Sequence, residues 1–176
     1  IIVVHKGSGI LSVGTDNRSD GTAYSIVRNY LKNKDPHLKL FIIHRLDRDT
    51  SGLMMFAKNI EAKEAMQHNW NNMVLSRTYV AVVEGKVEEE SGTVRSYLAE
   101  TSQYEVYSTQ NPEEGQLAIT RYKRLDCRHG YSLMELSLDT GRKHQIRVHM
   151  KDLGHPIVGD RKYGAKSSPH RRMALH

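Results

Sequence analysis

The nine residues HRLDRDTSG, at positions 44–52, contain two carboxylates, two guanidinium groups, an imidazole and two hydroxyls. Few structural turns need such a density of charge. If Asp47 ends an extended strand, its carboxylate and that of Asp49 point to one side and Arg48 to the other, because strand side chains alternate. Such carboxylates can act as an acid, a base or a nucleophile. The competing interpretation is a solvated turn with local Arg–Asp pairs.

A second polar cluster, TGRKHQIRVH, lies at positions 140–149. It places Arg142, Lys143 and Arg147 near the start of an expected short helix, where the helix dipole disfavours cations. An RNA phosphate or a carboxylate would explain them, and arginine suits a planar, two-pronged contact with either. His144 and Arg147 share one helix face at i, i+3. A basic surface helix without a specific ligand is the alternative.

Other kinds of catalytic site find no support in the sequence. The chain has ten histidines, but no HExxH or CxxC spacing, and His144 and His149 fall on different faces of a helix. It also contains no GxSxG, Walker or GxGxxG motif. We therefore expect neither a metal nor a cofactor, which leaves carboxylate chemistry.

Composition is that of a globular protein with a basic surface. The 176 residues, 38% of them hydrophobic, suffice for one core, or for one core with a lobe on each side of a cleft. The 26 Lys and Arg against 20 Asp and Glu give a net charge of +6, which suits a polyanionic partner without requiring one. With no repeat or linker, one domain over residues 1–176 is expected.

The sequence shows no clear targeting signal, and it contains one cysteine. No apolar run approaches the roughly 20 residues that span a bilayer, and the start IIVVHKGSGILSV lacks the pattern of a secretory signal. We expect a cytoplasmic location and no membrane partner. The single cysteine, Cys127, excludes an intramolecular disulfide and is expected to be a partly buried thiol.

The first cluster lies between two expected strands. Residues 40–43 and 53–57 are short apolar runs typical of strands, so the polar residues form the turn between them. Before them, Thr22 caps an expected amphipathic helix that ends near Asp35 and Pro36. Its apolar positions are Ala23, Ile26, Val27, Tyr30 and Leu31.

The later chain mixes strands and helices. Residues 79–83 predict a strand, and residues 117–125 and 131–138 predict two paired strands. Thr140 is expected to cap a short helix that Gly154 ends. A helical stripe expected in the core comprises Ala62, Ala65, Met66, Trp70 and Met73. The buried side of the later helix is expected to comprise Ile146, Met150 and Leu153. Short turns between adjacent strands favour an antiparallel or mixed sheet, hence the α+β class.

Three blocks in this order resemble the motifs of RluA-type pseudouridine synthases. They are HRLDRDTSGL at 44–53, RTYVAVVEG at 77–85, and TGRKHQIRVHM at 140–150 followed by LGHPIVGDRKYG at 153–164. The resemblance covers nearly the whole chain. HRLD followed by TSG argues against the related RsuA type, which usually has Gly-Arg-Leu-Asp. The resemblance implies a mixed, mainly antiparallel sheet flanked by helices, with a central basic cleft.

The resemblance also implies roles for single residues. Asp47 would be the essential catalytic aspartate and Arg147 the basic partner that pairs with it. Tyr79 would stack near the target base and assist proton transfer, although a core aromatic is the bland alternative. Arg45 would help to displace the target uridine. The other basic residues expected to contact RNA are Arg48, Arg142, Lys143 and His144.

The sequence departs from the family pattern at three places. Arg77 replaces a lysine, Lys143 replaces a common threonine, and HKGSG near the start replaces Asn-Lys-Pro-x-Gly. The final residues RRMALH look like the beginning of a segment that continues as another strand. We therefore expect a catalytic-domain fragment, or a trimmed minimal member, without the small N-terminal RNA-binding domain.

The expected activity is isomerisation of specific uridines in structured ribosomal or transfer RNA by a monomer. The reaction needs base flipping but no external group, and Asp47 could act as nucleophile or as base. One alternative is an RNA or nucleoside N-glycosidase that uses Asp47 and Asp49. The other is an RNA-binding module without chemistry.

Overall fold

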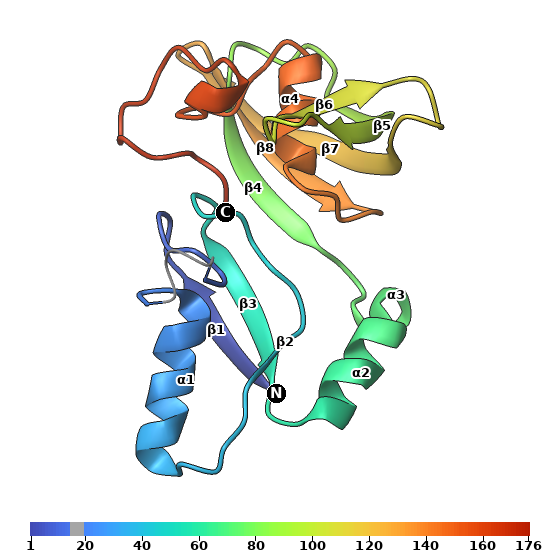
Figure 1. The fold of residues 1–176 in the computed structure, drawn as a ribbon. Coiled ribbons are helices and arrows are strands. Elements are labelled where there is room, and N and C mark those ends of the chain that lie inside the picture. Colours follow the sequence, from blue (N-terminus) through green and yellow to red (C-terminus); the bar gives the residue numbers. More distant parts are fainter. Residues whose placement is uncertain (15–19) are drawn as a thin grey trace. The chain divides into compact units, whose positions relative to one another are not determined.

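The computed structural model describes residues 1–14 and 20–176. In that part the chain forms two compact units, Ile1–Leu75 and Ser76–His176 (Figure 1). Each unit has its own antiparallel sheet with helices packed against it. The α+β class is confirmed, but the described strands form two sheets where one was expected. The single catalytic domain and the central basic cleft stay predictions.

The sheet of the first unit has the strand order β1-β3-β2. Strands β1 (Ile2–Lys6) and β2 (Phe41–Ile42) both run antiparallel to β3 (Gly52–Ala57). The strands expected at 40–43 and 53–57 are confirmed with slightly different ends. The polar turn therefore joins β2 to β3, as the sequence predicted.

Helix α1 (Ala23–Lys34) covers one face of this sheet. Thr22 is its N-cap, with a reciprocal capping box to Ser25, and the helix ends at Asp35, so both expected ends are confirmed. Its buried residues pack with Met54 and Phe56 of β3; they are Ala23, Val27 and Leu31. Ile26 and Tyr30 are exposed, because they lie on the flanks of the apolar stripe.

The helical stripe expected at 62–73 is divided between α2 (Ile60–His68) and α3 (Trp70–Met73). Met66 is buried and Trp70 half-buried, whereas Ala65 and Met73 are exposed. The prediction of one core stripe was therefore wrong. Asn69 ends α2, so the residues that follow do not continue its buried face.

The sheet of the second unit has the order β4-β8-β7-β5-β6. Its strands are β4 (Thr78–Glu84), β5 (Ser91–Glu100), β6 (Val106–Thr109), β7 (Gln116–Arg128) and β8 (Tyr131–Leu138). The expected pairing of the last two is confirmed. They form a hairpin whose turn residues His129 and Gly130 both have positive φ, the geometry that suits a tight hairpin.

Helix α4 (Gln145–Asp152) packs on this sheet and completes the second core. Met134 and Leu136 of β8 are buried in one cluster with Ile146 and Met150 of the helix. Leu153 is only partly buried.

After α4, the 3-10 helix η1 (Arg161–Tyr163) leads into the C-terminal residues, which return along β4. There the Val80 amide donates to the His176 carbonyl at 2.8 Å.

Cys127 lies in β7 and is half-buried, as expected for a free thiol. It forms part of the strand that pairs with β8, where its backbone is opposite Ser132. None of the helices in the described ranges is long and apolar enough to cross a membrane.

Candidate functional site

Asp47 lies in the loop of residues 43–51, which joins β2 to β3. Asp47 is half-buried, and the neighbouring Arg45 and Arg48 are exposed. The Asp47 carbonyl accepts a hydrogen bond from the amide of the buried Thr50 at 3.3 Å. The loop therefore fixes the backbone directly after the aspartate and leaves both arginines accessible.

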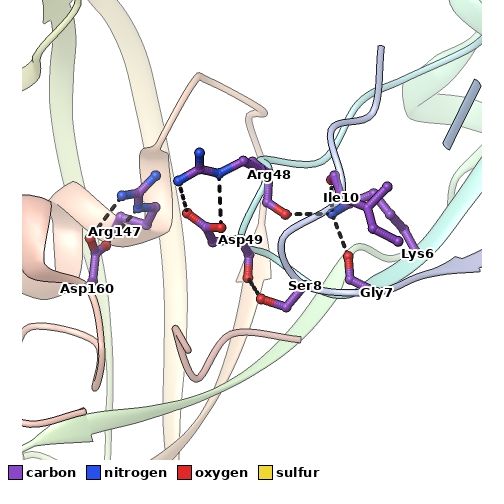
Figure 2. Close-up of polar contacts among 8 residues, drawn as sticks. All are labelled: Lys6, Gly7, Ser8, Ile10, Arg48, Asp49, Arg147 and Asp160. Atoms are coloured by element: carbon purple, nitrogen blue, oxygen red, sulfur yellow. Dashed lines mark hydrogen bonds and ion pairs between the residues drawn. The ribbon is translucent and has the colours of Figure 1, made fainter. Parts of the chain in front are cut away.

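Lys6, the last residue of β1, contacts the backbone of this loop through its side chain (Figure 2). It is 2% exposed, and its Nζ donates to the carbonyls of Gly7 at 3.1 Å, Ile10 at 2.9 Å and Arg48 at 3.0 Å. Burial lowers the pKa of Lys6, and the negative charges of the two loop aspartates act against that shift. A buried cation thus holds the carbonyl that follows Asp47.

Two serines of the same N-terminal segment also bond to the loop backbone. The Ser8 Oγ donates to the Asp49 carbonyl at 2.8 Å (Figure 2). The Ser12 Oγ accepts from the Leu46 amide at 3.0 Å and donates to the Leu46 carbonyl. The backbone is therefore held on both sides of Asp47. This support was not predicted from the sequence, in which HKGSG stands out only as a departure from the family pattern.

Arg48 and Asp49 form an ion pair within the loop (Figure 2). The Arg48 Nε and Nη2 donate to the two Asp49 carboxylate oxygens at 3.1 and 3.2 Å, and the side chains are 59% and 39% exposed. The opposite orientation expected for an extended strand was therefore wrong, and the local Arg–Asp pair of the competing interpretation is present. The two residues lie in a turn and not in an extended strand, so strand alternation does not apply.

Arg147, on α4, forms a buried ion pair with Asp160 (Figure 2). Its Nε and Nη2 donate to the two Asp160 oxygens at 2.7 and 2.8 Å, with side chains 9% and 2% exposed. The guanidinium also lies 4.9 Å from the centre of the Tyr163 ring. Asp160 was not among the site residues predicted from the sequence, although it lies in the block LGHPIVGDRKYG. The pairing of Arg147 with Asp47 stays a prediction.

Thr140 does not cap α4, which corrects the expectation from the sequence. Its Oγ1 accepts from the Ile119 amide at 2.8 Å and donates to the Gln145 Oε1 at 2.9 Å. The residue before the helix is His144, which has a left-handed backbone conformation and makes no side-chain cap bond. Thr140 and Gln145 therefore fasten the segment before α4 to β7.

The three predicted RNA-contacting residues of this segment all have partners within the protein. The Arg142 Nε donates to a backbone carbonyl of β7 at 3.0 Å, and Lys143 forms an ion pair with Glu100. The His144 Nδ1 lies 2.7 Å from the Tyr163 hydroxyl. Both cations therefore have acceptors within the second unit. Their contact with RNA stays a prediction.

Tyr79 is half-buried on β4, opposite Leu136 of β8, and packs against the core of the second unit. This partial burial agrees with the alternative interpretation of Tyr79 as an aromatic residue of the core. Arg77, just before β4, donates to the Asp139 carbonyl at 2.9 Å and lies against Gly141. The strand that carries Tyr79 is thus joined to the segment before α4. The catalytic role of Tyr79 stays a prediction.

A second buried polar group holds α4 against the sheet. His149 is fully buried, with its Nδ1 2.8 Å from the Thr120 Oγ1 and its Nε2 3.1 Å from the Ser96 Oγ. Burial lowers the pKa of His149 to about 4, although the negative charge of Asp152 opposes this shift. A neutral His149 therefore ties α4, and with it the backbone of Arg147, to β5 and β7.

The family described as RNA pseudouridylate synthase matches residues 1–152 of the chain. The uncharacterized RNA pseudouridine synthase YlyB of Bacillus subtilis is 40% identical over 180 residues, which cover 100% of this chain and 59% of that protein. The ribosomal large subunit pseudouridine synthase D of Borreliella burgdorferi is 31% identical, over 99% of this chain and 55% of that protein. The chain thus spans somewhat more than half of the length of these relatives.

Two solved human structures have the same fold. Human RNA Pseudouridylate Synthase Domain Containing 4 has a TM-score of 0.81 at 24% identity, over 99% of this chain and 77% of that one. Human RNA Pseudouridylate Synthase Domain Containing 1 has a TM-score of 0.79 at 26% identity, over 99% and 71%. The resemblance drawn from the three sequence blocks is therefore confirmed, and the chain belongs to the RNA pseudouridylate synthase family, in its RluA branch.

Proposed function

We propose that this chain converts selected uridines of structured RNA to pseudouridine, with Asp47 as the catalytic carboxylate. The observation that carries this proposal is the support of the Asp47 loop by residues 6–12. Bonds to the backbone on both sides of Asp47 limit the positions of its carboxylate, as a reaction centre requires. The type of reaction is inferred from membership of the RNA pseudouridylate synthase family.

The reaction is an isomerisation in which no external group is consumed. The bond from the ribose C1′ to the uracil N1 breaks, the base turns, and C1′ bonds to C5. The proton on C5 is lost and N1 gains one. Asp47 assists the departure of uracil, either by attack on C1′ or by removal of a ribose proton. The uridine must first leave the stack, at a cost of a few kcal/mol.

We assign the other predicted residues to the same reaction. Arg147, whose guanidinium is fixed by Asp160, is the cationic partner that orients Asp47. Tyr79 stacks near the flipped base, and the exposed Arg45 takes part in displacing it. The remaining RNA contacts are assigned to Arg48, Arg142, Lys143 and His144. The target as ribosomal or transfer RNA, the monomeric state and the cytoplasmic location are also predictions.

An N-glycosidase that uses Asp47 and Asp49 as a carboxylate pair is less well supported. Both carboxylate oxygens of Asp49 accept hydrogen bonds from Arg48, so Asp49 would have to leave this pair to act as a second catalytic carboxylate. An RNA-binding module without chemistry would have no use for a fixed aspartate backbone. The two alternatives also differ from the synthase in their products. A glycosidase releases free uracil, and a binding module forms no product.

The test is an Asp47→Asn substitution in the intact protein. The substrate is total RNA from cells that lack the gene, with tritium at the uracil C5, because bond formation at C5 releases tritium to water. We expect the wild type to release tritium without free uracil. Asp47→Asn should release none while it still binds RNA, and Asp49→Asn, the matched control, should stay active. Turnover by a folded Asp47→Asn protein would refute the assignment.

A further inference from the structure

Tyr104 is the most exposed tyrosine side chain in the hairpin between β5 and β6, with 73% of the residue accessible. Its backbone has a φ of 62°, a left-handed conformation that non-glycine residues rarely adopt. The loop around it is nevertheless well defined. The Tyr104 amide donates to the Thr101 carbonyl at 2.9 Å, and the Thr101 amide donates to the Glu105 carbonyl at 2.8 Å. The hairpin therefore presents an aromatic ring to solvent from a fixed backbone.

Two lysines from different parts of the second unit converge on Tyr104. The Lys143 Nζ lies 5.5 Å from the centre of the ring, and the Lys162 Nζ donates to the Tyr104 carbonyl at 3.0 Å. Lys143 belongs to the segment before α4, and Lys162 belongs to η1. Core packing does not explain this arrangement, because the ring is exposed. Lys143 also pairs with Glu100, and the exposed ring beside two ammonium groups suits an external ligand that is both planar and anionic.

We propose that Tyr104, with Lys143 and Lys162, forms a stacking site for an unpaired nucleobase of the RNA substrate. The inference rests on the proposed function in taking RNA as the ligand. Proteins that bind single-stranded RNA combine exposed aromatic rings, on which bases stack, with basic side chains that contact phosphates. Lys143 directly follows Arg142 and precedes the helix of Arg147, so the site continues the predicted basic segment of this unit.

The test measures RNA affinity of the whole chain by fluorescence anisotropy, with a labelled 12-nucleotide oligouridine as the probe. Tyr104→Asn removes the ring, while asparagine tolerates the left-handed backbone, so the hairpin keeps its shape. We expect this variant to bind roughly tenfold more weakly, in line with the typical loss per stacked base. Tyr104→Trp should bind as well as the wild type. Affinity for a 12-base-pair RNA duplex should not change, because its bases are already stacked.

Two further variants complete the test, the first of them as a control. Tyr107→Ala removes another exposed tyrosine, three residues away and on the adjoining strand β6, and should not change the affinity. Lys162→Met should lower the slope of log affinity against log salt by about one, as expected for one lost phosphate contact.

Equal binding by Tyr104→Asn and the wild type, or an equal loss on single strand and duplex, would overturn the inference. The assay involves no turnover, so its outcome is separate from that of the proposed function. If tritium release depends on Asp47 but oligouridine binding does not depend on Tyr104, only the stacking site is wrong. If binding depends on Tyr104 but no pseudouridine forms, only the proposed activity is wrong.

Discussion

The loop of residues 43–51 and the segment of residues 140–149 hold their charged side chains in different ways. In the loop, an N-terminal segment bonds to backbone atoms around Asp47. In the segment, buried side chains bond to one another, as Arg147 does to Asp160. Chemistry and stability are therefore separable in the loop, where a side chain can change while the backbone stays supported. They are coupled in the segment, where the charged group is itself part of the core.

The largest expected effect comes from breaking the buried pair. Asp160→Asn removes the negative charge that the buried Arg147 guanidinium contacts, and we expect a loss of about 3–5 kcal/mol in the free energy of unfolding. Urea denaturation measures this loss. The matched variant is Asp49→Asn, which breaks the exposed pair with Arg48 and should cost less than about 1 kcal/mol. Similar losses in the two variants would remove the difference between the regions.

The second effect is a pH dependence in the segment of residues 140–149, which arises from His149. The pKa of His149 is lowered to about 4 in the folded protein by burial, against 6.5 in the unfolded chain. Between these values the unfolded chain binds a proton that the folded protein does not. Stability should therefore fall as the pH decreases from 6.5 to 4, by about 3 kcal/mol in total, with no further loss from this group below pH 4.

Urea denaturation at several pH values between 4 and 7 tests this dependence. His149→Gln can still bond to the neighbouring hydroxyls but does not titrate, so its stability should lack this part of the pH dependence. An unchanged slope in His149→Gln would assign the pH dependence to other groups.

The third effect on stability concerns the support of the loop by Lys6. Lys6→Met removes three hydrogen bonds to carbonyls, and we expect a loss of about 2 kcal/mol. The amide of Thr50, which bonds to the Asp47 carbonyl, should exchange faster with solvent. Turnover should fall roughly tenfold or more, because misplacement of a catalytic group is costly. Lys58→Met, at an exposed lysine, is the control. Unchanged turnover in Lys6→Met would show that the loop does not need this support.

Local patterns in the sequence predicted the elements that local interactions build. Thr22 and Asp35 end α1 as expected, because capping involves only nearby backbone groups. The β7–β8 hairpin follows from two strand-like runs around a short turn. The prediction of one helical stripe at 62–73 was wrong because Asn69 ends α2. The prediction that Thr140 caps α4 was wrong because the Thr140 hydroxyl bonds to the amide of Ile119, which lies 21 positions away in the chain.

The sequence by itself determined the family and the positions of the charged clusters, since both are carried by residue types at short spacings. Only the tertiary structure showed what holds these clusters. Lys6 is 42 residues from the carbonyl of Arg48 to which it bonds, and His149 is 53 residues from Ser96. The loss of solvent makes such distant bonds necessary, because a buried polar group must find a partner within the protein. Which partner it finds depends on the packing of strands and helices, so it cannot be predicted from residues at short spacings in the sequence.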